Sequence, residues 1–308
     1  MALLIQNVEL DGNQTDVLIE ENRFKTIAPN QAVGDAQVLD GKDMAILPTF
    51  VNMHTHAAMT LLRSYADDLE LHDWLTNYIW PLEAKLDEED IYNGARLACL
   101  EMIKSGTTGF NDMYWHFHGT ARAVEEMGLR AMLSSVFIDF SDEAKAKEQR
   151  DLTKELFYES RQYSDRIGFA LGPHALYSVS EKSLRWARDF AEENDLLLHI
   201  HISETIKEVE DCLAKYGLRP VQWLDKIGLL GPNVIAAHVV HVTNEEIRIL
   251  AERGVKVVHN PASNMKLASG SFPYGKMADR GVEVLLGTDG CSSNNNLDMM
   301  EEMKLATL

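Results

Sequence analysis

Apolar and polar residues alternate along the chain with two different rhythms. Within residues 1–47, short apolar stretches such as 3–5 and 17–19 are separated by polar turns. The dipeptide Asp11-Gly12 lies between these two stretches and favours a tight hairpin turn between strands. We therefore predict a small β unit at the start of the chain, too short to bury a core by itself.

From about residue 45 the rhythm changes to short apolar runs that alternate with longer amphipathic segments. Each apolar run has the length of a buried strand and is bounded by polar residues or glycine. The predicted strands are residues 45–53, 106–112, 130–138, 167–172, 196–202, 234–240, 255–259 and 282–288.

The segments between these strands carry helix start and stop residues. Asp87 opens a periodic run that ends at Gly106, Ser180 opens another, and Thr243 opens a third that Gly254 stops. Strands that alternate with helices imply an α/β fold in which helices cover parallel strands. Eight such units predict a (β/α)8 TIM-like barrel, although the same alternation permits an open doubly wound sheet.

Composition narrows the class of protein. The 308 residues are 45% hydrophobic and 25% charged, which is typical of a globular chain. The net charge of −19 disfavours binding to nucleic acid or to an anionic membrane surface. No apolar run approaches the ~20 residues of a membrane helix, and the start lacks the pattern of a signal peptide.

The three cysteines are widely spaced and odd in number, so they give neither a disulfide framework nor a zinc-ribbon spacing. This usage suits a reducing compartment, and we expect a cytoplasmic protein.

Histidines and acidic residues gather where the predicted strands end, which is the catalytic face of such a barrel. A buried strand end is a costly place for an ionisable group unless a metal or a hydrogen-bond partner compensates it. The residues are His54 and His56 after the first strand, His174 after the fourth, His201 and Glu204 at the fifth, His238 and His241 at the sixth, His259 at the seventh and Asp289 at the eighth.

Alternate residues of a strand point the same way, so an H-x-H pair can present two imidazoles to one cation. We interpret the pair His116 and His118 as loop histidines near the pocket rim, and His199 as an interior histidine. Asp289 has two interpretations, a helix cap or a ligand, of which the ligand is favoured. Three imidazoles and one carboxylate fit a single zinc-like ion, and no lysine ends the fourth strand to bridge a second metal.

Five stretches together resemble the amidohydrolase superfamily, and more narrowly the 5′-methylthioadenosine/S-adenosylhomocysteine deaminases. They are PTFVNMHTH at residues 48–56, His201-x-x-Glu204, Ala237-His238, HNPASN at residues 259–264 and GTDG at residues 287–290.

The resemblance implies a set of roles. The metal ligands would be His54, His56, His201 and Asp289, holding Zn²⁺ with Fe and Mn as alternatives. Glu204, His238 and Asp289 would be catalytic. Glu83 and His174 would hold a purine nucleoside, and relatives of this kind often form homo-oligomers.

Residues 57–83 are rich in Leu, Met and Trp. They have two equal interpretations, an apolar flap over the pocket or a helix pair on the barrel rim. Trp80 and Glu83 within them, together with His174 and Glu204, are the candidate substrate-binding residues.

The chemistry expected of this set is hydrolytic deamination of an adenine nucleoside. Asp289 would take the proton of water, Glu204 would protonate ring N1, and His238 would orient the hydroxide. The alternatives are hydrolysis of another ring (guanine, cytosine or a chlorinated triazine) and a non-catalytic barrel scaffold.

Two departures from the resemblance stand out. Relatives that accept S-adenosylhomocysteine are expected to place an arginine near the end of strand three, where this chain has Ser135, and Arg150 lies further on. Methylthioadenosine or adenosine is therefore favoured as substrate.

The second departure is the ending, because the chain stops at Leu308 inside the helix expected after strand eight. We expect a partial β-sandwich domain at residues 1–47 and a C-terminally incomplete hydrolase barrel at residues 48–308.

Overall fold

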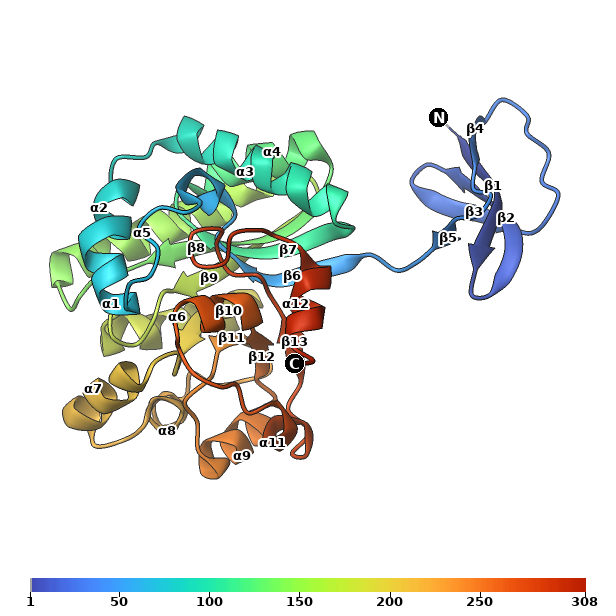
Figure 1. Cartoon of the computed structure of the whole chain (residues 1–308). Coiled ribbons are helices and arrows are strands. Elements are labelled where there is room, and N and C mark those ends of the chain that lie inside the picture. Colours follow the sequence, from blue (N-terminus) through green and yellow to red (C-terminus); the bar gives the residue numbers. More distant parts are fainter. Residues whose placement is uncertain (1) are drawn as a thin grey trace. The chain divides into compact units, whose positions relative to one another are not determined.

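The computed structural model describes residues 2–308 (Figure 1). They fold into two compact units, one that ends at Thr49 and one that spans Phe50–Leu308. Within the described residues, none of the helices is both long enough and apolar enough to cross a bilayer.

The N-terminal unit is a five-stranded sheet in the order β3-β2-β1-β4, with β5 also paired to β1. Asp11 and Gly12 both have positive φ (50° and 77°), the backbone that a tight hairpin between β1 and β2 requires, so the predicted hairpin is confirmed. The strands are β1 (Leu3–Leu10), β2 (Asn13–Glu20), β3 (Arg23–Ile27), β4 (Gln37–Asp40) and β5 (Ala45–Ile46).

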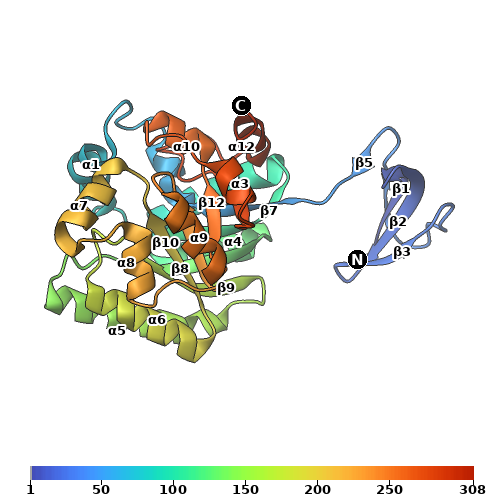
Figure 2. The ribbon, with the colours of Figure 1, turned by 90° about the horizontal axis from the view of Figure 1, so that it is seen from below.

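The second unit is built on eight parallel strands that follow one another in chain order, from β6 to β13. Helices surround this sheet on the outside (Figures 1 and 2). The predicted α/β barrel is confirmed. The strands are β6 (Phe50–Thr55), β7 (Thr107–Tyr114), β8 (Arg130–Phe137), β9 (Ile167–Pro173), β10 (Leu197–Ile202), β11 (Val234–His238), β12 (Lys256–His259) and β13 (Val284–Leu286).

Hydrogen bonds between the first and last strands close the barrel, which excludes the open doubly wound sheet. The Asp289 amide donates to the His54 carbonyl at 2.9 Å, and the Asn52 side chain bonds Thr288 in both directions. Gly287 makes this approach possible, because a Cβ there would lie 2.7 Å from the His54 nitrogen and 2.8 Å from its oxygen.

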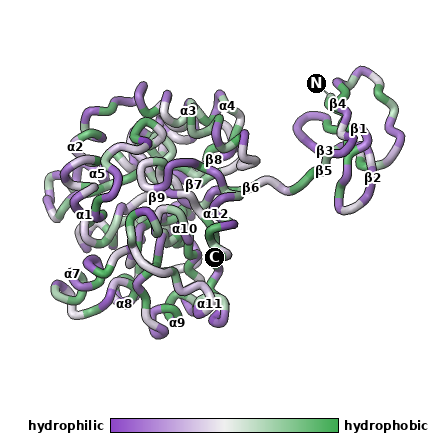
Figure 3. The backbone as a smooth tube through the Cα atoms, in the orientation of Figure 1, coloured by the Kyte–Doolittle hydropathy of each residue, from purple (hydrophilic) through white to green (hydrophobic). Residues whose placement is uncertain are grey.

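The predicted helix starts are confirmed by their caps. Asp87 and Thr243 each form a capping box with the residue three positions on, and the Ser180 side chain accepts from the Ser183 amide. The surrounding helices alternate hydrophilic and hydrophobic positions, so each buries one face (Figure 3). The main helices are α3 (Glu88–Lys104), α4 (Phe117–Met127), α5 (Glu143–Glu159), α6 (Glu181–Asn194), α7 (Ile206–Tyr216), α8 (Pro220–Lys226), α9 (Asn244–Arg253), α10 (Pro261–Lys266), α11 (Tyr274–Ala278) and α12 (Met299–Leu305).

Three predicted strands were clearly wrong in extent, and of these the run 282–288 is reduced to β13 (Val284–Leu286). The run 45–53 divides into β5 of the small sheet and β6 of the barrel, separated by a segment containing Pro48, which has no N–H to donate to a ladder. The run 234–240 ends at His238, because His238 and Val239 take positive φ (70° and 49°) and leave the extended conformation.

Strand β10 shows how the barrel aims its histidines. Leu198, Ile200 and Ile202 belong to the hydrophobic core that packs against the helices. The intervening His199 and His201 point to the opposite face and make their contacts inside the barrel.

Candidate metal centre and active site

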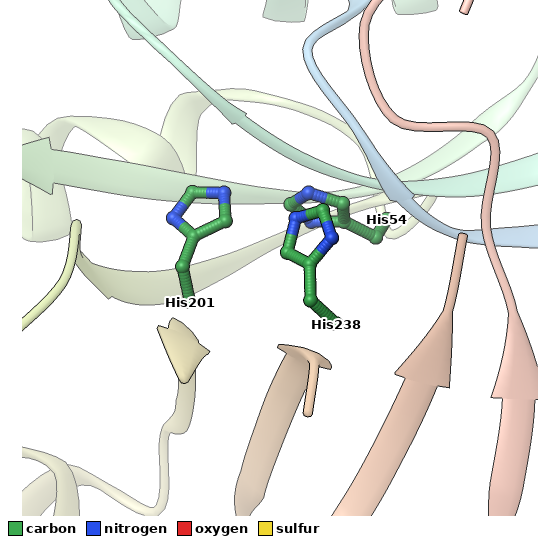
Figure 4. Close-up of side chains that lie close together, drawn as sticks. All are labelled: His54, His201 and His238. Atoms are coloured by element: carbon green, nitrogen blue, oxygen red, sulfur yellow. The ribbon is translucent and has the colours of Figure 1, made fainter. Parts of the chain in front are cut away.

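Histidines from different strands converge at the carboxyl end of the barrel. The rings of His54, His201 and His238 lie together at the ends of β6, β10 and β11 (Figure 4). In a second, overlapping group, ligand atoms of His54, His56 and Asp289 lie within 4.8 Å of one another. Both groups share His54, so the described residues place one compact set of donors around one point.

Backbone carbonyls orient two of these rings. The Nδ1 atoms of His56 and His201 lie 2.5 Å from the Met113 oxygen and 2.7 Å from the His174 oxygen. A carbonyl only accepts, so each Nδ1 carries a proton and each Nε2 is turned toward the site. This is the arrangement that a metal-ligating histidine requires.

His54 is oriented by the interior His199. The His54 Nδ1 lies 2.8 Å from the Nε2 of His199, which is fully buried as expected of an interior histidine. The Nε2 of His54 is buried and makes no hydrogen bond with any described residue. Burial, opposed by Asp289, lowers the pKa of His54 to about 4, so the ring is neutral.

Two serines hold the carboxylate that follows β13. The Asp289 Oδ2 accepts hydrogen bonds from Ser263 at 2.6 Å and from Ser293 at 2.9 Å. Its Oδ1 faces the Nε2 atoms of His54 and His56, at 3.3 and 3.2 Å. Burial would raise the pKa of Asp289, but the two histidines hold it well below its ordinary value.

These donors fit a divalent cation. His54, His56 and His201 each present an Nε2 atom to the site. The Oδ1 atom of Asp289 makes no contact with a serine, and the buried Nε2 of His54 has no hydrogen-bond partner among the described residues. His54, His56, His201 and Asp289 are therefore the residues that would hold the ion. His238 stands beside them.

The loop after β10 carries Glu204 into the same site. The carboxylate of Glu208, one turn further along α7, accepts from the Ser203 and Glu204 amides at 2.8 and 2.9 Å. Ser203 has a φ of 52°, so these bonds hold a left-handed turn in place. The Glu204 carboxylate lies 3.8 Å from the His238 Nε2, and burial raises its pKa.

His238 is oriented by a residue of the HNPASN stretch. Its Nδ1 lies 2.9 Å from the Asn264 Oδ1, which leaves its Nε2 facing Glu204. Asn264 and Ser263 belong to the HNPASN stretch at residues 259–264, but their partners lie far along the chain and were not predicted.

An inner cavity of about 50 Å³ adjoins the ligands. His56, His201, Glu204, His238 and Asp289 line one side of it. Residues 57–83, here called the flap, supply much of the other side. The flap residues that line the cavity are Met59, Leu71, Trp74, Leu75, Trp80 and Glu83.

The flap is built from short helices of three kinds. It contains η1 (Ala57–Leu62), α1 (Leu71–Trp74), the π-helical turn η2 (Leu75–Ile79) and α2 (Trp80–Glu83). The interpretation as a cover over the pocket is the one that these lining residues favour.

The candidate nucleoside-binding residues lie at this cavity. Glu83 is buried and accepts a hydrogen bond from the Trp115 indole at 3.1 Å, and burial raises its pKa. The His174 Nδ1 lies 2.8 Å from the Ser178 hydroxyl, and burial lowers the pKa of His174 to about 3. Trp115 was not predicted as a site residue, because only the fold brings it to Glu83.

Four further residues named from the sequence lie outside the ligand set. His116 and His118 begin α4 and line an outer chamber of about 700 Å³, away from the ligands. Ser135 bonds the Thr153 hydroxyl of α5 at 3.0 Å. Arg150 bonds the Ser183 hydroxyl at 3.1 Å, so its guanidinium is engaged at α6.

Comparison with known proteins shows the family of the chain. The sequence profile of the Amidohydrolase family matches residues 45–308. The 5′-deoxyadenosine deaminase of Methanothermobacter thermautotrophicus is 50% identical over 297 residues, which cover 95% of this chain and 69% of the relative. The 5-methylthioadenosine/S-adenosylhomocysteine deaminase of Thermococcus sibiricus is 50% identical over 315 residues, which cover 100% of this chain and 74% of that protein.

A solved structure is similar over nearly the whole chain. The adenosine deaminase from Xanthomonas campestris, solved with bound zinc, has a TM-score of 0.89 and 36% identity, covering 99% of this chain and 72% of that one. With the profile match and the two relatives, this similarity shows that the chain belongs to the amidohydrolase family.

Proposed function

We propose that this chain hydrolyses adenine nucleosides, converting the 6-amino group to a carbonyl and releasing ammonia. The relatives at 50% identity are deaminases of 5′-deoxyadenosine and of methylthioadenosine or S-adenosylhomocysteine. The observation that carries the proposal is the convergence of four ligand side chains and the Glu204–His238 pair on one cavity that Glu83 and His174 also line.

Zinc is the proposed ion, because the donor set of three imidazoles and one carboxylate suits it and the similar adenosine deaminase was solved with zinc. A divalent cation at such a site supplies hydroxide near neutral pH by lowering the pKa of water from ~15.7 to ~7.

The protein groups around the ion divide the proton transfers. Asp289, with Oδ2 held by two serines, accepts the water proton and later passes it to the leaving amine. Glu204, whose pKa burial raises, holds the proton that ring N1 requires as oxygen adds to C6. His238, whose ring is fixed by Asn264, orients the attacking oxygen through its Nε2.

The nucleoside sugar belongs at the junction between the inner cavity and the outer chamber. Trp80, Glu83, Tyr114, Trp115 and Val136 line both spaces. A ribose held by Glu83 therefore directs its 5′ substituent into the outer chamber, whose volume of about 700 Å³ suits a small-molecule pocket.

The chamber wall favours an uncharged 5′ substituent. Val136, Ile138, Phe140, Leu152 and Leu156 contribute apolar surface. Arg150 is not among the lining residues because it bonds Ser183 instead, and the lining Lys145 is exposed with its ammonium over the Phe140 ring. We propose that a 5′-methylthio or 5′-deoxy group is preferred to the charged tail of S-adenosylhomocysteine.

The base requires more room than the inner cavity now offers. A volume of about 50 Å³ holds a few waters, whereas ligand pockets typically measure ~300–1,000 Å³. Trp80 borders the inner cavity and both adjoining chambers, of about 700 and 440 Å³. We propose that the flap moves to admit the base.

A cytoplasmic location agrees with the thiols, since Cys99, Cys212 and Cys291 are free and buried. The net charge of −19 supports a small-molecule partner rather than a nucleic acid. A homo-oligomer is also proposed, which light scattering of the purified protein tests.

An ammonia-release assay with the zinc-loaded protein tests the activity. The panel contains 5′-deoxyadenosine, methylthioadenosine, adenosine, S-adenosylhomocysteine, guanine, cytosine and a chlorinated triazine. We expect kcat/KM for methylthioadenosine to exceed that for S-adenosylhomocysteine by at least about tenfold. Turnover of guanine alone, or of no member of the panel, would contradict the proposal.

A further inference from the structure

Trp115 makes a partly buried contact that no step of the proposed reaction uses. It follows Tyr114 at the end of β7, whereas Glu83 ends α2 in the flap. Its indole Nε1 donates to the Glu83 Oε2 at 3.1 Å. Glu83 is only 8% exposed and Trp115 is half-buried, so this contact links the barrel strand β7 to the flap at the wall of the cavity.

The contact fixes which oxygen of the carboxylate is available. A carboxylate offers about four acceptor positions on two oxygens, and the indole occupies one position on Oε2. The Tyr114 hydroxyl faces the same carboxylate without a hydrogen bond of regular geometry. Because Glu83, Tyr114 and Trp115 all line the junction of the two cavities, the remaining acceptor positions face the place of the sugar.

We propose that Trp115 is a positioning residue, which sets the Glu83 carboxylate to accept both hydroxyls of a vicinal diol and makes the site select ribonucleosides against 2′-deoxyribonucleosides. This inference rests on the proposed nucleoside site. A buried acceptor that loses its donor is left without a partner, so a sugar that lacks the 2′-hydroxyl binds poorly only while the carboxylate is held in place.

The charge state of Glu83 agrees with this role. Burial raises the pKa of Glu83, and the contacts with Tyr114 and Trp115 oppose that shift. The indole N–H therefore helps to keep the carboxylate ionised, which is the form that accepts two hydroxyl donors.

Binding of the reaction products reports how Glu83 is positioned without requiring the enzyme to turn over. Isothermal titration calorimetry of the zinc-loaded protein with inosine and with 2′-deoxyinosine measures the selectivity for the diol. We expect the wild-type protein to bind inosine at least about tenfold more tightly, as a hydrogen bond to a charged group predicts. Trp115→Phe removes the N–H, keeps an aromatic ring, and should reduce this preference to within about threefold.

Trp186→Phe is the matched control. Trp186 lies on α6, stacked on Phe190, and is not among the residues lining either cavity at the site. This variant should keep the full preference for inosine. If Trp115→Phe fails to fold, benzothienylalanine at position 115 replaces the N–H with sulfur and preserves the shape.

The outcomes separate this inference from the proposed activity. Loss of the preference in the position-115 variant alone supports the inference, whether or not ammonia is released. A preference that survives there, or a wild-type protein that binds both nucleosides equally or neither, overturns it. Ammonia release from 5′-deoxyadenosine by the same wild-type sample then shows whether the proposed function still stands.

Discussion

The strand ends and the flap both contain residues with left-handed backbone, but these residues are buried at the strand ends of the candidate metal centre and more exposed in the flap. At the strand ends, Ser203 and Asp289 have positive φ and are buried, and side chains fix both turns. In the flap, Ser64 and Asp68 have positive φ and are exposed.

This difference separates the residues proposed for proton transfer from those proposed to cover the substrate. The groups that move protons sit on backbone that is pre-organised by hydrogen bonds, as electrostatic catalysis requires. The groups proposed to cover the substrate sit on short, irregular helices, which we expect to open at a lower free energy than the barrel strands. The chemistry should therefore respond to small changes at the strand ends, whereas the flap should respond through substrate binding.

The largest expected effect belongs to Glu204, the proposed proton donor, which lies in the loop that Glu208 holds. Glu204→Gln keeps the size of the side chain and removes the proton, so kcat should fall by ~10²–10⁴-fold. Metal content, measured on the same sample by elemental analysis, should be unchanged. Near-normal turnover with full metal content would remove Glu204 from this role.

A smaller effect is expected from the serines that hold Asp289. Ser263→Ala leaves Oδ2 with one hydroxyl donor in place of two, and zinc affinity should fall by ~10–100-fold. Competition with a chelator of known affinity measures the change. Ser135→Ala is a control of the same kind, because Ser135 contacts Thr153 away from the ligands, and it should leave zinc affinity unchanged.

Hydrogen exchange tests whether the flap opens more readily than the barrel strands. Amides of η1 and η2 should exchange at least about tenfold faster than those of β10 and β11, because the flap opens without unfolding the barrel. Bound inosine should slow exchange in the flap more than in the strands. Equal protection of the two regions would break the distinction between them.

The smallest predicted effect concerns the closure of the barrel, where the residues after β13 lie against β6. Gly287→Ala places a Cβ against the His54 backbone and should lower the free energy of unfolding by ~1–3 kcal/mol. Gly275→Ala is the matched control, because it meets open space in α11, and should raise stability by ~0.5–1 kcal/mol. Denaturant unfolding measures both, and equal effects would contradict the role of Gly287.

The fold could be predicted because each of its causes is local. Caps such as Asp87 and Thr243 and the alternation of apolar runs act within a few residues, so they can be seen in the sequence. The strand 45–53 was wrong for a reason that is not local. Pro48 marks a break within the run, but the first residues pair with β1, and no local pattern shows that the run serves two sheets.

The candidate site also has a part that the sequence predicts and a part that it does not. H-x-H spacing and the positions of strand ends predict that His54, His56, His201 and Asp289 gather, because parallel strands end at one face. The contacts that orient them join distant segments, such as Ser263 with Asp289 and Trp115 with Glu83. No periodicity predicts which serine or tryptophan makes such a contact.

The central claim is that one cation is held by His54, His56, His201 and Asp289. Elemental analysis of the purified protein, before and after chelation and in parallel with the ammonia assay, tests it most directly. We predict one divalent ion per chain, loss of activity in proportion to its removal, and recovery when zinc is restored. Full deaminase activity in the metal-free protein, or an undiminished metal content in His201→Ala, would contradict it.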